Sequence, residues 1–241
     1  MRLDKFLTAC GVGTRSEVKK IVKSGAVSVN GKVAAKADIH LDPNTDTVTA
    51  YGREIKYREF VYLMLNKPQG YLSATRDGRT PTVMELVPDE YIHFEPFPVG
   101  RLDIDTEGFL LMTNDGDLAH RLLSPKKHIP KTYVAQLEKA VGESDVEAFK
   151  KGVILDDGYK TLPAELKSLS ESEPYFAEIV IHEGKFHQVK RMFEAVDNKV
   201  LYLKRTKMNR LALDDSLELG EIREITEEEM KLLVPEDASE E

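Results

Sequence analysis

The chain has 241 residues, of which 41% are hydrophobic and 32% charged, proportions that are typical of a globular protein. This length suits one medium domain and one small one, and no stretch approaches the roughly 18 uninterrupted apolar residues of a membrane span. The single cysteine, Cys10, excludes an internal disulfide and a zinc site built from several cysteines. Because the N-terminal residues also lack the apolar run of a signal peptide, we expect a cytoplasmic protein that does not bind a membrane.

The formal net charge of −8 is unfavourable for a protein that binds nucleic acid, because phosphate contacts need Lys and Arg. The charge is, however, unevenly distributed along the chain. Residues 1–40 are locally basic, whereas residues 221–241 are strongly acidic, and we expect residues 235–241 to form a solvated acidic tail. Local patches decide where a polyanion binds, so the net charge leaves nucleic-acid binding open.

Residues 1–58 are expected to form a small domain of two helices and a hairpin. Residues 14–17, Thr-Arg-Ser-Glu, have the pattern of a capping box, which predicts a helix that runs to about Ser24. Val-Ser-Val at residues 27–29 alternates as a strand does, and the Asn-Gly pair that follows favours the positive φ values of a type I′ hairpin turn.

The helix that follows the capping box has two distinct faces. Val18, Ile21 and Val22 fall on one face, which we expect to pack against the rest of the domain. A second face carries the basic residues Arg15, Lys19 and Lys23 at intervals of four. On charge pattern alone, this basic face is either ordinary solvated surface or a binding site for a polyanion.

Residues 60–234 are expected to form a second, larger domain. Apolar or alternating runs predict strands at residues 61–65, 132–137 and 176–181. Helical patterns predict helices at residues 118–123, 143–151 and 187–196. Strands and helices mix without a regular βαβ rhythm, so the predicted fold class is α+β, with a mixed, largely antiparallel sheet.

The richest candidate for chemistry is the segment 100–116, in which three acidic residues alternate from Asp103 onward. An EF-hand calcium loop that began at Asp103 would need a Glu at its twelfth position, where this chain has Asn114. A Mg²⁺-dependent aspartyl-phosphate phosphatase would need a long apolar strand before the first Asp, but residues 97–102 are short and interrupted. The calcium loop is therefore disfavoured, and the phosphatase remains an alternative.

Other common signatures are absent from the sequence. It has no Gly-rich phosphate loop, no nicotinamide fingerprint and no His-Glu-x-x-His zinc motif. We therefore expect no metal site and no cofactor. Asp105 and Thr106 are interpreted as residues that cap a turn before a core strand.

Gly-Arg-Leu-Asp at residues 100–103, followed by Asp-Thr at 105–106 and Gly-Phe-Leu-Leu at 108–111, resembles the catalytic loop of the pseudouridine synthases. Further similarities to that family lie at residues 66–70, 82–83, 113–116, 131–133 and 183–193. Residues 1–32 resemble the S4 domain, a small RNA-binding module. The resemblance implies an enzyme that isomerises uridine to pseudouridine in ribosomal RNA. Within the branch that carries an S4 domain, the chain looks most like synthases that modify 16S RNA, and relatives that modify 23S RNA share the architecture.

In this family one Asp is the essential carboxylate, and the resemblance assigns that role to Asp103. The reaction breaks the bond from C1′ to N1 and joins C1′ to C5, and the sequence leaves open whether it proceeds through a covalent adduct or a glycal. Lys190 fills the position at which the family keeps a basic residue to pair with this Asp. The alternative for Lys190 is a phosphate contact, which it would share with Lys185 and Arg191.

The resemblance also implies residues that bind the RNA. Tyr133 would lie against the flipped uracil, and its alternative is a core tyrosine in an alternating strand. Arg101 would contact a phosphate or the vacated stacking space, and its alternative is an exposed turn residue. The S4-like segment would dock RNA through its basic helix face and hairpin, with contacts from Arg2, Lys5, Arg15, Lys19, Lys23 and Lys32.

We expect the partner to be ribosomal RNA and the protein to act as a monomer. A hypothesis from another class is a non-catalytic ribosome-assembly factor that binds RNA through the S4-like segment. Such a factor would bind RNA equally well but would leave no pseudouridine.

Overall fold

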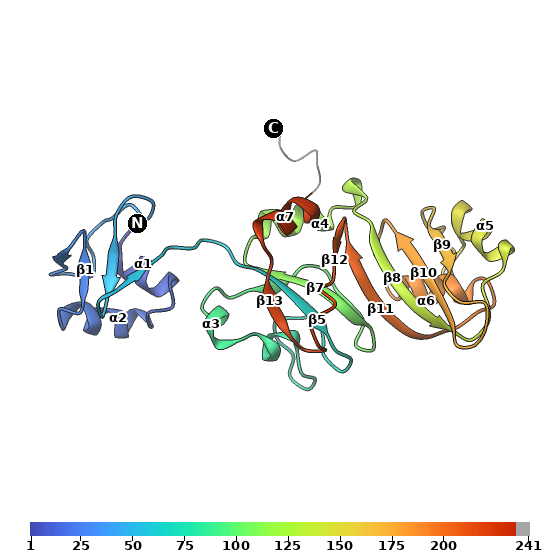
Figure 1. Cartoon of the computed structure of the whole chain (residues 1–241), viewed down its shortest axis with the longest axis horizontal. Coiled ribbons are helices and arrows are strands. Elements are labelled where there is room, and N and C mark those ends of the chain that lie inside the picture. The colour runs from blue at the N-terminus through green and yellow to red at the C-terminus, as the bar shows by residue number, and fades with distance from the viewer. Residues whose placement is uncertain (235–241) are drawn as a thin grey trace. The chain divides into compact units, whose positions relative to one another are not determined.

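The computed structural model describes residues 1–234, which form two compact units (Figure 1). Unit 1 consists of Met1–Val61 together with Val87–Pro96. Unit 2 consists of Tyr62–Leu86 and the described chain from Phe97 onward. The acidic tail that we expected at residues 235–241 lies outside the described residues. Within residues 1–234, no helix is both long and apolar enough to cross a membrane.

Unit 1 combines two helices with a small antiparallel sheet of strand order β2-β1-β3-β4. The elements are α1 (Leu3–Ala9), α2 (Arg15–Lys23), β1 (Val27–Val29), β2 (Lys32–Val33), β3 (Val48–Ala50), β4 (Arg53–Ile55) and α3 (Asp89–Ile92). The predicted capping box is present, because Thr14 and Glu17 each accept a hydrogen bond from the other's backbone N–H. The predicted turn is present too, with φ of 50° at Asn30 and 76° at Gly31.

The core of unit 1 lies between the helices and the sheet. Leu3 and Phe6 of α1 pack with Val18 and Val22 of α2, and all four side chains are buried. Ile21 is only partly buried at the edge of this cluster. The helix face predicted to pack is therefore the one that packs, and the basic face of α2 is left to solvent.

Unit 2 is built on one sheet of nine strands, with the order β13-β5-β7-β11-β8-β10-β9 and with β6 and β12 paired at β7 and β11. The strands are β5 (Tyr62–Lys67), β6 (Phe97–Pro98), β7 (Glu107–Thr113), β8 (Lys131–Leu137), β9 (Glu165–Ser168), β10 (Tyr175–Ile181), β11 (Val200–Met208), β12 (Leu211–Ala212) and β13 (Ile222–Glu224). The pairing of β7 with β11 is parallel, and the other recorded strand pairs are antiparallel. This confirms the predicted α+β class with a mixed, largely antiparallel sheet.

The helices of unit 2 are α4 (Gly116–Leu123), α5 (Glu143–Lys151), α6 (Gln188–Glu194) and α7 (Glu227–Leu233), with short 3₁₀ turns η1 (Val83–Leu86) and η2 (Pro125–Lys127). Helix α5 has the predicted bounds. Helix α6 begins one residue later than predicted because His187 has a φ of 49°, in the left-handed region that an α-helix cannot include.

The central core of unit 2 joins strands β5 and β7 to helix α4. Phe109 and Leu111 of β7 pack with Met64 of β5 and with Leu118 and Leu122 of α4, and all five side chains are buried. Helix α7 adds to the same cluster, and Figure 1 shows it beside α4. Strand β7 is therefore buried along most of its length, and the acidic segment identified in the sequence leads directly into its N-terminal end.

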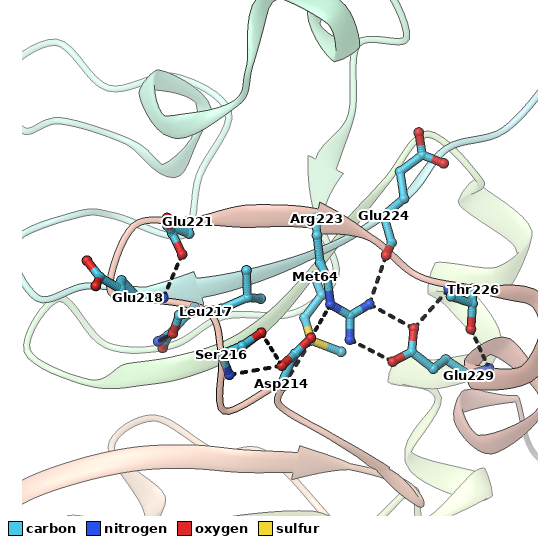
Figure 2. Close-up of polar contacts among 11 residues, drawn as sticks. Met64, Asp214, Ser216, Leu217, Glu218, Glu221, Arg223, Glu224, Thr226 and Glu229 are labelled. Carbon is cyan, nitrogen blue, oxygen red and sulfur yellow. Dashed lines mark hydrogen bonds and ion pairs between the residues drawn. The ribbon is translucent and has the colours of Figure 1, made fainter.

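An arginine network fastens the last strand and helix of the described chain (Figure 2). Arg223 of β13 donates from Nε to Asp214 at 2.6 Å, and both of its terminal nitrogens donate to the Glu229 carboxylate, at 2.8 and 2.6 Å. Hydrogen bonds from Ser216, together with the Arg223 contact, lower the pKa of Asp214 to about 2. Bidentate Arg–carboxylate pairs fix geometry as well as charge, so this network aligns α7 with the edge of the sheet.

Candidate active site

The acidic segment forms a loop between β6 and β7 that is held from below by main-chain and side-chain contacts. The Ser73 hydroxyl bonds both the N–H and the carbonyl of Leu102, each at 3.0 Å. The N–H of Gly70 donates to the carbonyl of Ile104 at 2.8 Å. These contacts bury Leu102. The next residue, Asp103, points toward solvent, with 27% of its side chain exposed.

A fully buried lysine lies under this loop. Lys67 Nζ donates to the carbonyls of Asp103 and Thr106, at 3.1 and 2.9 Å, and to that of Pro68 at 3.0 Å. Burial lowers the pKa of Lys67 to about 8, against the opposing pull of the Asp105 and Asp103 carboxylates. Its ammonium therefore organises the turn of the loop through carbonyl oxygens rather than through a direct ion pair.

Helix α6 brings the partners of Asp103. Lys190 Nζ lies 3.4 Å from Asp103 Oδ2, and His187 Nε2 lies 3.7 Å from Asp103 Oδ1. The Lys190 side chain is only 20% exposed, so its charge is partly shielded from water. The first turn of α6 and the loop before β7 thus place a cation and an imidazole on the two oxygens of one carboxylate.

Asp105 shares the same lysine, at 2.6 Å from Lys190 Nζ. Desolvation raises the pKa of Asp105, but the hydrogen bond and charge of Lys190 outweigh it and hold that pKa below its usual value. We predicted only a turn-capping role for Asp105, and that prediction was incomplete. The N–H of Thr106 does close the turn onto the carbonyl of Asp103, at 3.1 Å, and this tight turn presents residues 103 and 105 to the same side.

Tyr133 lies on β8 in the interior of the sheet, and only 8% of it is exposed. It pairs with Arg205 of the neighbouring β11. Arg205 is buried, with its Nε donating to the carbonyl of Phe109 at 2.7 Å and its Nη2 without a hydrogen-bond partner among the described residues. No hydrogen bond or ion pair joins Tyr133 to Asp103 or Lys190 in the described part of the chain.

Arg101 lies at the start of the loop and is exposed, with no ion pair among the described residues. The structure therefore brings Lys190 to Asp103, while no hydrogen bond or ion pair within residues 1–234 joins Arg101 or Tyr133 to that pair.

From the sequence, no individual role was assigned to three residues of this site: Lys67, His187 and Glu183. Glu183 accepts hydrogen bonds from the Tyr159 hydroxyl at 2.6 Å, from the N–H of Leu162 at 2.9 Å and from Gln188 Nε2 at 2.8 Å. It anchors the start of α6 and hence the position of Lys190. All three lie inside segments that resembled the pseudouridine synthases, but no local pattern distinguished them from their neighbours.

In unit 1, a hollow of about 350 Å³ is lined by Arg2, Asp4, Lys5, Arg15 and Lys19. Four of the six cations expected to bind RNA are thus gathered in one place. Arg2 is tied to Asp4 by two hydrogen bonds, at 3.0 and 2.6 Å. The other two expected cations, Lys23 and Lys32, are exposed and do not line this hollow.

Within residues 1–234, no group of three or more His, Cys, Asp or Glu side chains is arranged to hold a metal ion. The site offers two carboxylates that share one lysine, and one of them, Asp103, also has an imidazole beside it. Such a carboxylate can act as a nucleophile or as a general base.

Comparison with known proteins identifies the fold and the family. The family profile of RNA pseudouridylate synthase matches residues 61–195, and that of the S4 domain matches residues 1–46. An uncharacterized RNA pseudouridine synthase of Bacillus subtilis (strain 168) is 55% identical over 97% of this chain and 98% of its own length. The ribosomal small subunit pseudouridine synthase A of Escherichia coli (strain K12) is 39% identical over 97% of this chain and 100% of its own.

Among solved structures, a crystal structure of a pseudouridylate synthase matches with a TM-score of 0.68 and 37% identity, over 97% of this chain and 100% of that one. The similarity thus covers both units of the described fold. The chain belongs to the RNA pseudouridylate synthases and is an RNA pseudouridine synthase that carries an S4 domain at its N-terminus.

Proposed function

We propose that this enzyme isomerises a uridine of ribosomal RNA, in the 16S RNA of the small subunit, with Asp103 as its catalytic carboxylate. The assignment to the small subunit is supported by relatives named ribosomal small subunit pseudouridine synthase A, which are about 40% identical over nearly the whole chain. The observation that carries the catalytic role is the contact of 3.4 Å between Asp103 and Lys190 on a carboxylate that still reaches solvent.

The reaction needs a negatively charged group next to the bond between the sugar and the base. Lys190 places a positive charge 3.4 Å from the Asp103 carboxylate, on the side of Oδ2. Asp103 then either attacks the sugar–base unit or removes a proton from it, and the C1′–N1 bond breaks. The uracil turns and C1′ bonds to C5; C5 loses its proton to solvent, which is the tritium that the assay measures, and N1 takes up a proton. Both routes use the same carboxylate and no cofactor.

The target base must leave its stack before Asp103 can reach its sugar, at a cost of a few kcal/mol. We assign the recovery of part of that cost to Tyr133, whose ring would lie against the flipped uracil. Arg101 is exposed and available to contact a phosphate or the vacated stacking space. These two residues and Asp103 belong to one unit of one chain, which supports catalysis by a monomer.

The S4 domain would supply much of the affinity for RNA. The basic hollow lined by Arg2, Lys5, Arg15 and Lys19 supports this role, because lysines and arginines that neutralise phosphates dominate affinity for nucleic acid. Lys23 and Lys32 would extend the contact along the exposed surface of the domain.

The catalytic assignment is tested with Asp103→Asn. We expect release of tritium from 5-tritiated uridine RNA to fall at least about a thousandfold, while RNA affinity stays near that of the wild type. The matched variant is Asp105→Asn, which removes the other carboxylate on Lys190 and should retain measurable turnover. Substantial turnover by Asp103→Asn would refute the assignment.

The substrate is tested by mapping pseudouridines in ribosomal RNA from cells that lack the protein. Loss of one site in 16S RNA, restored by the wild-type gene but not by Asp103→Asn, is the expected result. Loss of a site in 23S RNA would overturn the small-subunit assignment. No loss in either RNA would favour the non-catalytic assembly factor.

A further inference from the structure

An exposed aromatic ring stands beside the proposed reaction centre. Phe186 lies in the loop between β10 and α6, and it is 75% exposed, more than any other large hydrophobic residue recorded as exposed in the described chain. Its ring stacks on the imidazole of His187, with the ring centroids 3.7 Å apart and the planes 18° from parallel. The imidazole in turn reaches to 3.7 Å from Asp103. One face of Phe186 is therefore covered by His187, and the ring stays largely open to solvent.

The loop that presents this ring is held by several contacts. The N–H of Lys185 donates to Gln188 Oε1 at 2.8 Å, and the N–H of Gln188 donates back to the carbonyl of Lys185 at 3.2 Å. Gln188 also donates to Glu183 at 2.8 Å. The left-handed backbone of His187, with a φ of 49°, is a sparsely populated conformation that persists only where surrounding contacts impose it. The aromatic pair is thus preorganised before any ligand binds.

The charges around Phe186 suit a polyanion. Lys185 is exposed on one side, with Nζ 4.5 Å from the centre of the Tyr159 ring. Arg191, whose Nη1 lies 3.4 Å from the carbonyl of Phe186, is already paired with Asp156 and Asp157. Lys185, which directly precedes Phe186 in the chain, has no carboxylate partner within residues 1–234, so its ammonium is available to a phosphate of an RNA strand that stacks on Phe186.

We propose that Phe186 is a stacking platform for the nucleobase adjacent to the target uridine. The inference rests on Asp103 being the reaction centre. Asp103 contacts Nε2 of His187 and has no recorded contact with Phe186, so we assign a base on the open face of Phe186 to a neighbouring nucleotide and not to the one that reacts. Phe186 would act as a positioning residue: it holds the strand beside the flipped uridine and makes turnover depend on a base at that neighbouring position.

The test uses a tritiated ribosomal RNA fragment that the wild-type enzyme modifies. We expect Phe186→Ala and Phe186→Leu to lower kcat/KM roughly 5- to 150-fold, the loss of one base–aromatic stack, chiefly through KM. Phe186→Tyr, which keeps the ring, should stay within about twofold of the wild type. The control Leu169→Ala, at an apolar residue that is 46% exposed outside this loop, should leave kcat/KM unchanged.

A second arm removes the base instead of the ring. An abasic nucleotide is placed directly 5′ or directly 3′ of the target. At one of these two positions it should lower kcat/KM of the wild type by the same factor as Phe186→Ala does. At that position it should not lower kcat/KM of Phe186→Ala any further. The Asp103→Asn variant is expected to bind RNA without turnover. In this background, the fluorescence of 2-aminopurine at that position should be quenched when residue 186 is Phe or Tyr, but not when it is Leu.

Unchanged kinetics in Phe186→Ala would overturn the proposal. The proposal would also be overturned if the abasic nucleotide and Phe186→Ala lowered kcat/KM independently, so that their factors multiply. Phe186 would then act only through the fold and not through that base. Turnover by Asp103→Asn, in contrast, would refute the catalytic assignment, and the coupling between ring and base would still be measured.

Discussion

The carboxylates of Asp103 and Asp105 share the ammonium of Lys190, but they lie at different distances from it. Lys190 is closer to Asp105, at 2.6 Å, than to Asp103, at 3.4 Å. Asp105 makes the shorter contact and so helps to hold the lysine, whereas Asp103 is the carboxylate that also has an imidazole beside it, with His187 Nε2 3.7 Å from its Oδ1. Asp103 is also the less exposed of the two, with 27% of its side chain open to solvent against 60% for Asp105, so the proposed division of roles follows from partners and burial rather than from residue type.

This geometry separates the two hypotheses for Lys190. We expect Lys190→Gln to lower kcat for tritium release by about 10- to 100-fold, with RNA affinity changed little, because the lost charge acts on Asp103. The control Lys185→Gln, at an exposed lysine, should affect affinity and not kcat. A Lys190→Gln variant that loses RNA affinity while keeping kcat would identify Lys190 as a phosphate contact.

Lys67 predicts a pH dependence of stability. Its pKa is about 8 in the folded chain and 10.5 as the ordinary value, so between these pH values the unfolded chain binds more protons than the folded one. The free energy of unfolding attributable to Lys67 therefore rises as pH increases from about 8 to about 10.5. Urea unfolding of the wild type and of Lys67→Met across this range checks the prediction. The difference between their free energies of unfolding should change with pH, and a constant difference would contradict the prediction.

At the scale of elements, the loop before β7 depends on a close approach between two parallel strands. Gly108 has a φ of 102°, and a Cβ at this position would collide with the backbone carbonyl of Arg205 on β11. Only glycine combines that backbone conformation with the absence of a side chain. The approach sets where β7 starts, and with it the position of the loop that carries Asp103.

We expect Gly108→Ala to destabilise the protein by about 2–4 kcal/mol, since strain and overpacking coincide there. Turnover should fall with it, because β11 and the catalytic loop must separate. Gly116→Ala is the matched control, since no atom lies within 4 Å of a Cβ at that helical position. Urea unfolding of both variants checks the prediction. Equal midpoints would show that β7 and β11 can move apart without loss of stability.

Elements with local signals were predictable from sequence, and contacts between distant residues were not. Helix α5 has the predicted bounds and α2 its predicted capping box, because caps and periodicity are written within a few residues. The carbonyls that Lys67 binds lie up to 39 residues away, and no local pattern encodes them. The expected pairing of Lys190 with Asp103 came from family resemblance, since 87 positions separate them in the chain.

At the scale of the whole molecule, we expect an acidic protein to bind a polyanion through a local basic surface. The net charge is −8, yet four cations line one hollow of the S4 domain. The long-range field repels RNA and the short-range contacts attract it, so affinity should depend strongly on salt. We therefore expect RNA to dock only on the surfaces where cations are concentrated.

We expect the double variant Arg15→Ala and Lys19→Ala to reduce the slope of log affinity against log salt concentration by about 1.4–1.8, the loss of two phosphate contacts. Lys150→Ala with Lys151→Ala removes the same charge from α5, where both lysines lie near Glu147, and should leave the slope unchanged. Filter binding of ribosomal RNA between 50 and 200 mM salt measures both. Equal slopes would show that the basic face of α2 is merely solvated.

Unit 1 is discontinuous in sequence, since it includes Val87–Pro96 as well as Met1–Val61. In that second segment the His93 ring lies against Gly11, and Phe94 lies under the Arg58 guanidinium at 5.6 Å. A gene fragment cut after Val61 would therefore expose the surface that these two rings cover. Transfer of unit 1 to another protein would therefore need residues 87–96 as well as residues 1–61.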